Sequence, residues 1–205
     1  MHSEERAFGT SAAADRFMSA TREFIRAATT TALPDDELGA ATDTLRALTS
    51  SLDAQRNHRG RRIPFTVDEG ERIRAGGTWR MFPFTPLGIP QEIAVSGDHA
   101  RSLIPLNAAH EGPPEMLHGG FGAAILDALL GVLVMVAETP AVTVELTTTY
   151  LAPTPLDRTV LAHGTIVERR GRTIVAEGAI TVDGRDTVRA RGVFVPFAMP
   201  PGPQR

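Results

Sequence analysis

The sequence predicts an α+β domain in which one long helix packs against an antiparallel β-sheet. An apolar run at residues 119–138 has the length and composition of a buried helix, and β-type runs lie before and after it. Arg170-Gly171 and Asp183-Gly184 are tight-turn signals between the last strand runs. Such turns are too short for the crossover that parallel strands require, so these strands are expected to pair antiparallel.

Two amphipathic helices are expected ahead of this domain. Apolar side chains share one helical face in residues 15–30, and they repeat at spacings of three and four from Leu38 to Leu52. Pro34 separates the two runs, and the three acidic residues that follow it favour the start of a helix. We expect residues 1–58 to form a helical hairpin that covers the main domain or supports a dimer. A separate binding function is the alternative.

Residues 59–90 lose this periodicity and mix Gly and Pro with aromatic residues, which predicts a linker that wraps the core. The aromatic side chains either anchor the linker or line a pocket: Phe65, Trp79, Phe82 and Phe84. The main domain is expected over residues 91–197, with a C-terminal tail at 198–205. Its strands are expected at QEIAV and ARSLIPL before the helix, and near 141–151, 158–169, 172–182 and 186–197 after it.

Composition narrows the chemistry. The chain of 205 residues has a net charge of -3 and contains no cysteine, so disulfides, thiolate metal sites and a cysteine nucleophile are excluded. The net charge gives no general attraction to nucleic acid. The N-terminal residues lack the profile of a secretory signal, which makes a cytoplasmic location the default expectation. All 21 basic residues are arginine, so arginine counts alone carry little weight.

Asp127 is the one polar side chain in the apolar run FGAAILDALLGVLVMVA. A carboxylate in a buried or membrane-spanning helix is costly unless it is paired or hydrogen-bonded. The presence of Asp127 at this position therefore has to be explained. Three readings are open: a catalytic carboxylate, an Asp satisfied by a backbone group or an Arg, and a membrane span. Asp at mid-helix costs roughly 2.5–3.5 kcal/mol on membrane insertion, and the β-rich region that follows supplies a sheet, so we expect no membrane partner.

The sequence His118-Gly119-Gly120 stands where the helix begins. The first backbone N–H groups of a helix lack intrahelical partners and can stabilise an oxyanion that forms on a carbonyl, and glycine lets a ligand approach closely. The eight residues from Gly119 to Asp127 span about 12 Å of helix. One carbonyl cannot touch both groups, so a shared site requires a second subunit with its helix antiparallel to the first.

The segments EGPPEMLHGGFGAAILDALLG and AVTVELTTTYLAPTP resemble the phenylacetyl-CoA branch of the hot-dog-fold acyl-CoA thioesterases. The resemblance covers residues 90–197 and implies an antiparallel sheet wrapped around a central helix. It implies that Asp127 acts as general base toward water or as nucleophile. It also implies that the Gly119 amide polarises the thioester carbonyl of the opposite subunit, and that His118 orients this carbonyl or fixes the turn.

The resemblance extends to further residues of the site. Thr143 matches a frequent hydroxyl position and is expected to bind the attacking water or hold Asp127. It is expected to share one strand face with Ala141, Glu145, Thr147 and Thr149, because side chains alternate along a strand. Gly112, Gly120 and Phe121 are expected near the substrate. Many members carry Asn six residues before the His, where this chain has Gly112, which leaves the orientation of the substrate open.

Arginines near the turn between two late strands are candidates for the CoA phosphates, and we name Arg170 and Arg172; solvated turn charges are the alternative. The histidines lack metal-ligand spacing, so no metal or organic cofactor is expected. The resemblance implies an acyl-CoA substrate and a homodimer, or a dimer of dimers. Two other functions stay open: a non-catalytic hot-dog protein that binds acyl-CoA or an acyl carrier, and a hot-dog dehydratase or hydratase.

Overall fold

The computed structural model describes residues 11–55 and 65–197, which fall into two compact units. The first unit contains the helices α1 (Ala12–Thr30) and α2 (Asp35–Asp53). The Ser11 hydroxyl caps α1 by accepting a hydrogen bond from the Ala14 N–H, and Pro34 is the N-cap residue of α2. The two predicted helices are therefore present, and neither has a buried residue.

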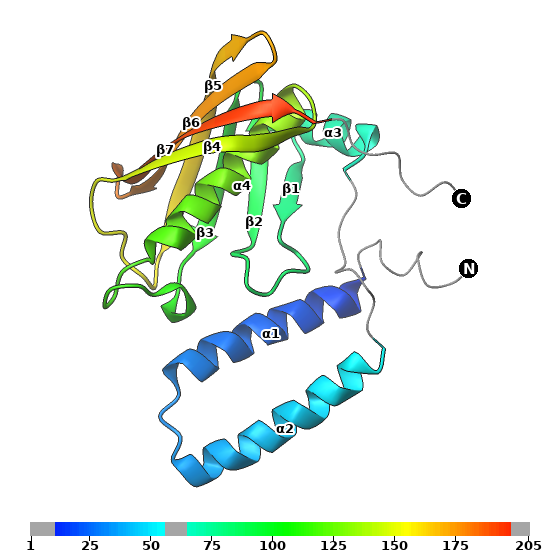
Figure 1. Cartoon of the computed structure of the whole chain (residues 1–205), viewed down its shortest axis with the longest axis vertical. Coiled ribbons are helices and arrows are strands. Elements are labelled where there is room, and N and C mark those ends of the chain that lie inside the picture. The colour runs from blue at the N-terminus through cyan, green and yellow to red at the C-terminus, as the bar shows by residue number, and fades with distance from the viewer. Residues whose placement is uncertain (1–10, 56–64, 198–205) are drawn as a thin grey trace. The chain divides into compact units, whose positions relative to one another are not determined.

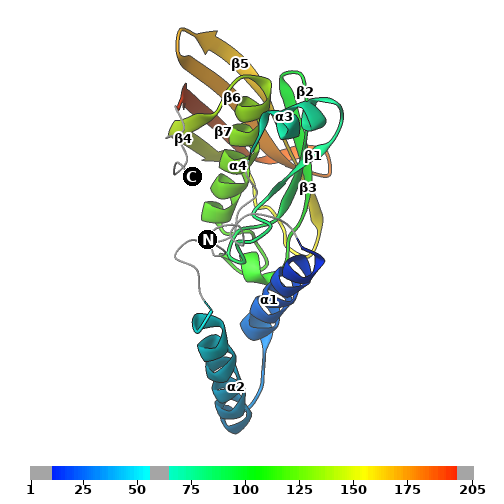
Figure 2. The same ribbon diagram turned by 90° about the vertical axis from the view of Figure 1, so that its right-hand side faces the viewer.

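The second unit is a seven-stranded antiparallel sheet with one long helix on its inner face (Figures 1 and 2). The strand order is β1-β2-β3-β5-β6-β7-β4. The chain forms these elements in sequence: α3 (Val67–Arg74), β1 (Thr78–Met81), β2 (Gln91–Ser96), β3 (His99–Pro105), a 3-10 turn η2 (Ala108–His110), α4 (Gly119–Ala137), β4 (Ala141–Tyr150), β5 (Thr159–Arg170), β6 (Thr173–Val182) and β7 (Arg185–Pro196).

The main elements agree with the sequence prediction, and the two tight turns have the backbone that hairpins need. Arg170 pairs with Thr173, and Val182 pairs with Arg185, so both connections are two-residue loops. Asp183 and Gly184 both have positive φ angles, of 48° and 79°. This backbone is typical of a type I′ hairpin turn, which Asp-Gly favours.

The segment predicted to be a wrapping linker does more than connect, because α3 and β1 lie inside it. Thr66 caps α3 by accepting from the Glu69 N–H. The Thr-x-x-Glu pattern that begins this helix is a recognised start signal, although the helix is too short to show a clear period. β1 pairs with β2 at the sheet edge, and Trp79 is buried with its ring 5.4 Å from that of Phe65. These two aromatic residues anchor the segment to the domain.

The core lies between α4 and the sheet. Leu126, Leu129, Leu130 and Leu133 of α4 are buried against strand residues that include Ile104, Ile180 and Phe194. Gly164 of β5 pairs with Gly178 of β6 where the helix comes closest. A Cβ built on Gly164 would lie 2.5 Å from Cδ2 of Leu130, so a side chain there would collide with the helix.

Polar contacts fix the C-terminal end of α4. The Arg74 guanidinium donates to the Val136 carbonyl at 2.8 Å. Arg169 of β5 bonds both Glu138, the C-cap residue of α4, and Asp98 of the β2–β3 turn. Among the described helices, α4 alone has the length and composition of a membrane span, and 56% of that span is buried inside the domain.

Among the described strands, β4 pairs with β7 alone and forms one edge of the sheet. A β-bulge interrupts it. The pairing register shifts between Thr143, which lies opposite Phe194, and Glu145, which lies opposite Val193. The expectation that Thr143, Glu145, Thr147 and Thr149 share a face is therefore wrong. The extra residue of a bulge reverses the alternation, so Thr143 faces α4, while the Thr147 hydroxyl bonds Glu145 on the opposite face.

The packing around two glycines predicts opposite effects on stability for their substitution by alanine. Gly164→Ala should lower the free energy of unfolding by about 1–3 kcal/mol, because the core there is already filled. Gly122→Ala, inside α4, should leave it unchanged or raise it by up to about 1 kcal/mol, because its Cβ would meet only ordinary contacts of 3.6 Å and longer. Urea denaturation measures both. A Gly164→Ala variant as stable as the wild type would contradict this packing.

Candidate functional site

The start of α4 is held by a set of hydrogen bonds centred on His118, the N-cap residue. Its ring Nδ1 accepts from the Gly120 N–H at 3.0 Å. Its carbonyl accepts from the N–H groups of Phe121 and Gly122, and its own N–H donates to the His110 carbonyl. Because an N–H faces Nδ1, this nitrogen carries the lone pair and the ring proton lies on Nε2. His118 thus fixes the turn and presents Nε2–H as a donor from an exposed side chain.

These bonds leave one amide of the first turn without a partner. Within the described part of the chain, the Gly119 N–H donates to no acceptor, whereas the N–H groups of His118, Gly120, Phe121 and Gly122 are all engaged. Gly119 is half-buried at the amino-terminal end of the helix, where the backbone dipole favours negative charge. The amide that the sequence singled out is therefore free to bind an anionic oxygen, while that of Gly120 is already used.

Gly112 has a packing role. The Glu111 carboxylate accepts from the Glu115 N–H at 2.6 Å and closes the EGPP turn. Gly112 then lies against His118, and a Cβ on it would come within 2.7 Å of the His118 Cα. No side chain fits at this position, so the absence of the family's Asn follows from the way the loop folds. The sequence could not show this close approach.

Asp127 lies half-buried on the side of α4 that the sheet does not cover. Its Oδ1 accepts a hydrogen bond of 2.8 Å from the Thr143 hydroxyl of β4. Among the described residues it has no ion-pair partner, so the reading in which an arginine neutralises it finds no support. Thr143 therefore orients the carboxylate through one oxygen and leaves the other available.

Two aromatic contacts support the turn from the other side. The Phe121 ring lies 5.6 Å from that of His110 and 6.1 Å from that of His118, in edge-to-face geometry. Burial lowers the pKa of His110, and its Nδ1 accepts from the Asn107 N–H. His110 is thereby kept neutral near pH 7 and serves as packing for Phe121. Phe121, predicted near the substrate, lies beside the His118 imidazole.

Tyr150, the single tyrosine of the chain, was missed in the sequence. It ends β4, and its hydroxyl donates to the Gly119 carbonyl at 2.9 Å. It also lines a cavity of about 400 Å³ beside Gly119, together with apolar residues from the loops before α4 and after β4: Pro113, Met116, Leu117, Leu151 and Pro153. Its position at the end of the threonine-bearing strand could have drawn attention to it. Its hydrogen bond to Gly119, however, depends on the bulge in β4.

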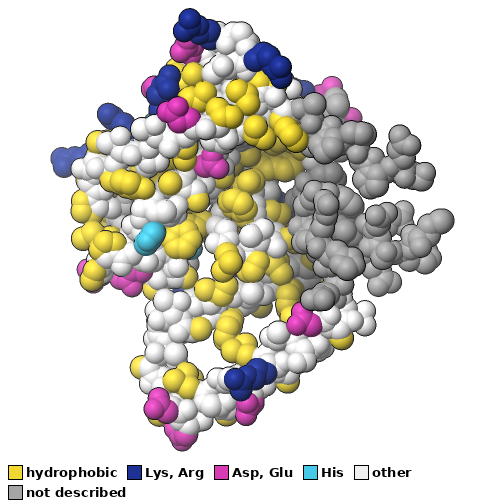
Figure 3. All heavy atoms as spheres, viewed as in Figure 1, with side chains coloured by type: hydrophobic (Ala, Val, Ile, Leu, Met, Phe, Trp, Pro, Cys, Tyr) yellow, Lys and Arg dark blue, Asp and Glu magenta, His cyan; other side chains and the backbone are white. Residues whose placement is uncertain are grey.

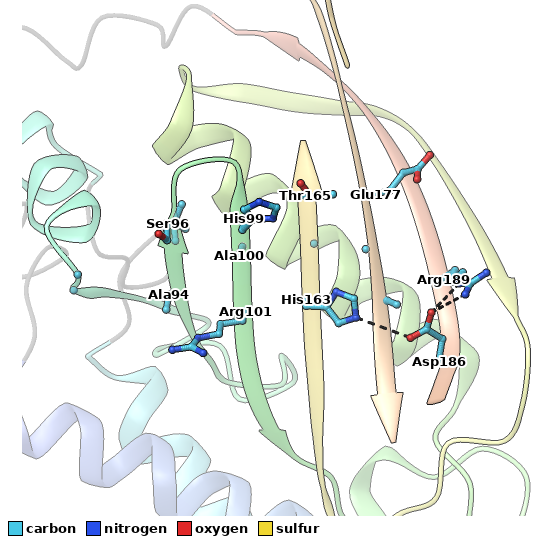
Figure 4. A pocket seen from close by; sticks show the side chains of 16 residues that line it. Ala94, Ser96, His99, Ala100, Arg101, His163, Thr165, Glu177, Asp186 and Arg189 are labelled. Carbon is cyan, nitrogen blue, oxygen red and sulfur yellow. Dashed lines mark hydrogen bonds and ion pairs between the residues drawn. The ribbon is translucent and has the colours of Figure 1, made fainter. Parts of the chain in front are cut away.

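A larger hollow of the domain lies elsewhere. It measures about 820 Å³ and opens on the sheet face that points away from α4 (Figure 4). None of the predicted site residues lines it. Arg189 there is paired with Asp186 at 2.9 Å and holds the pKa of that carboxyl below its usual range, and His163 shares the Asp186 network through the Thr181 hydroxyl. Size alone therefore does not identify the candidate site.

Arg170 and Arg172 are exposed at the β5–β6 turn, and the structure does not bring them to Gly119 in one protomer. Arg169 next to them bonds Glu138 at the C-terminal end of α4. Gly119 begins this helix of 19 residues, whose length is about 28 Å. Across the described residues, no group of three or more His, Asp or Glu side chains is placed to hold a metal ion.

Comparison with known proteins agrees with this arrangement. An antiparallel sheet around one long helix is the hot-dog fold, and residues 115–188 match the model of the thioesterase superfamily. This match covers the region from the loop before α4 into β7, so that part of the domain is similar to the thioesterase superfamily. No curated protein sequence matches the chain.

Solved structures resemble the chain to different extents. One thioesterase superfamily protein is 26% identical with a TM-score of 0.74, and the match covers 92% of this chain and 98% of that one. That share exceeds residues 65–197, so the likeness includes part of the helical unit. AziG of S. sahachiroi is 18% identical with a TM-score of 0.50, over 53% of this chain and 92% of its own. This second likeness concerns the fold alone.

The capping role of His118 predicts a stability effect that is independent of any activity. His118→Ala should lower the free energy of unfolding by about 1 kcal/mol, because the Gly120 N–H loses its acceptor. His118→Asn should retain most of the stability, since Asn is a good N-cap residue. Thermal or urea unfolding of the two variants measures the difference. Equal stability of His118→Ala and the wild type would contradict the capping bond.

Proposed function

We propose that the protein hydrolyses acyl-CoA thioesters to a free acid and CoA. The observation that carries this proposal is that one helix presents both a hydrogen-bond donor and an oriented carboxylate. Among the described residues, no acceptor bonds the Gly119 N–H at the start of α4. Asp127, the sole carboxylate of that helix, is oriented by Thr143 and has no described cation as a partner. The match of residues 115–188 to the thioesterase superfamily model supports thioester hydrolysis as the class of reaction. We propose acyl-CoA as the substrate.

The chemistry follows from these two groups. The thioester carbonyl oxygen accepts from the Gly119 N–H, and negative charge that develops on this oxygen is stabilised by the amide and the helix dipole. Asp127 takes a proton from water as the water oxygen adds to the carbonyl carbon. The carbon–sulfur bond then breaks, and the proton passes to the CoA thiolate. Attack by the carboxylate itself, followed by hydrolysis of the anhydride, uses the same placement.

Two subunits are needed to build one site. Gly119 and Asp127 are about 12 Å apart along the helix, further than one thioester can bridge. We propose that a second copy of the chain places its α4 antiparallel to the first, so that Asp127 of one protomer serves Gly119 of the other. The uncovered side of α4 permits close approach because its residues are small: Gly120, Ala124 and Gly131.

The free edge of β4 supports the same dimer. It is ten residues long, and none of the described strands pairs with its outer edge. Val142 and Val144 are 41% and 57% exposed, and apolar side chains gather over α4 and β4 on the face seen in Figure 3. Long, exposed, apolar edge strands are normally covered by another chain. Pairing of two β4 strands would continue the sheet across the dimer.

The antiparallel arrangement also gives Arg170 and Arg172 a role. From Asp127 to the end of its helix at Ala137 is about 15 Å. The β5–β6 turn of the subunit that supplies Asp127 would then lie about that far from the thioester, at the end from which the nucleotide part of CoA extends. We propose that these arginines bind the CoA phosphates, to which guanidinium groups are well suited.

Substitution of the carboxylate predicts loss of turnover with retention of binding. Asp127→Asn should reduce hydrolysis by about 10²–10⁴-fold, because an amide cannot accept the proton. Thiol release from acetyl-, palmitoyl- and phenylacetyl-CoA measures the rate. Calorimetry then measures whether Asp127→Asn binds the acyl-CoA that the wild type hydrolyses. Glu145→Gln, on the opposite face of β4, is the matched control and should remain active.

Two results would overturn the proposal. Hydrolysis by Asp127→Asn at the wild-type rate would show that another group drives the reaction. Binding of acyl-CoA by the wild type without thiol release from any of the three substrates would instead identify a non-catalytic acyl-CoA binding protein.

A further inference from the structure

Tyr150 contacts the proposed oxyanion-binding turn through both its hydroxyl and its ring. The hydroxyl donates to the Gly119 carbonyl at 2.9 Å. A Cβ built on Gly119 would lie 3.1 Å from the Cζ and the oxygen of Tyr150, so the ring is packed directly on the Gly119 backbone. This contact exists because the bulge in β4 turns Tyr150, which pairs with Val188, toward α4.

The hydrogen bonds restrain the peptide group that follows the free amide. The carbonyl of the Gly119–Gly120 peptide is held by Tyr150, and its N–H is held by Nδ1 of His118. The preceding peptide is restrained by the bonds to the His118 carbonyl. The Gly119 N–H belongs to the preceding peptide, whose plane fixes its direction, and the restraint on the following peptide keeps that plane from rotating about the Gly119 Cα. An amide preorganised in this way stabilises an oxyanion without having to reorient.

The same tyrosine forms one wall of the cavity beside Gly119. Met116, Leu117 and Val188 form other apolar parts of the wall, and Gly119 and Gly122 contribute the helix backbone. The loops that carry this wall are tied together, because the Leu117 N–H donates to the Thr154 carbonyl and the Leu151 N–H donates to the Thr187 carbonyl. The cavity is therefore a built feature of the domain, with no charged side chain in its lining.

We propose that this cavity is the acyl-chain site, and that Tyr150 both positions the Gly119 amide and limits the bulk of the acyl group. The proposal rests on the function proposed above, because a thioester held by the Gly119 N–H has one arm beside this cavity. A volume of about 400 Å³ is at the small end for ligand pockets. It suits an apolar acyl group of short to medium length or a single aromatic ring, and the polar pantetheine arm leaves on the other side.

Separate substitutions test the two roles of Tyr150. Tyr150→Phe keeps the ring and removes the hydroxyl, so kcat should fall about tenfold for every acyl-CoA while KM and the order of preference stay unchanged. Tyr150→Ala should show the same fall in kcat with short acyl groups and should shift relative kcat/KM toward long chains. Thr147→Val, on the opposite face of β4, is the control and should match the wild type.

A second enlargement of the cavity avoids dependence on one variant. Met116→Ala opens the wall without touching the Tyr150 hydroxyl, so it should shift the preference toward longer acyl groups with no general loss of kcat. It serves as the test of the cavity if Tyr150→Ala fails to fold.

The outcomes separate this inference from the proposed function. Wild-type kcat in Tyr150→Phe would overturn the positioning role. Unchanged acyl preference in a folded Tyr150→Ala and in Met116→Ala would overturn the acyl site, while hydrolysis by the wild type would leave the proposed function standing. Absence of hydrolysis by the wild type with any acyl-CoA would overturn both.

Discussion

α4 is held rigidly in the domain, and the geometry of the proposed site follows from this rigidity. The helix is fixed on the sheet by its leucines and at its C-terminal end by Arg74 and Arg169. Its free amide and its carboxylate are therefore held about 12 Å apart, and no side-chain rotation can bring them to one carbonyl. If both act on the same thioester, a site can form only where two helices meet, which makes association part of the proposed chemistry.

The edge strand β4 connects the two groups that this constraint separates. Thr143 near its beginning bonds Asp127, and Tyr150 at its end bonds the Gly119 carbonyl. Both face the helix only because a bulge lies between them. One strand thus orients both the proposed base and the proposed oxyanion donor, and its open edge lies where a second subunit is expected. The exposed edge of β4 and the two groups that this strand orients thus belong to the same proposed site.

Local sequence signals predicted the elements well and the long-range contacts poorly. The apolar run around Asp127, the Asp183-Gly184 turn and the alternating strands each carry their signal within a few residues, so their existence and their bounds were legible. The bulge at Thr143/Glu145 has no comparable signature, and strict alternation placed Thr147 on the wrong face. The packing of Gly112 on His118 and the bond from Tyr150 depend on the folded loops, so neither could be read from spacing. The short helix α3 was missed although its Thr66 and Glu69 capping pattern was present.

Mixing two inactive variants tests whether each site combines Gly119 of one subunit with Asp127 of the other. Asp127→Asn removes the carboxylate. Gly119→Pro removes the backbone N–H at the first position of the helix, which tolerates proline. Gly119→Ala keeps the N–H and is the control for Gly119→Pro. After unfolding and refolding together in equal amounts, half of the dimers are mixed, and each mixed dimer has one intact site. We expect recovery of about one quarter of wild-type thiol release from acyl-CoA. Activity that stays at the level of the separate variants, with mixed dimers shown to form, would contradict it.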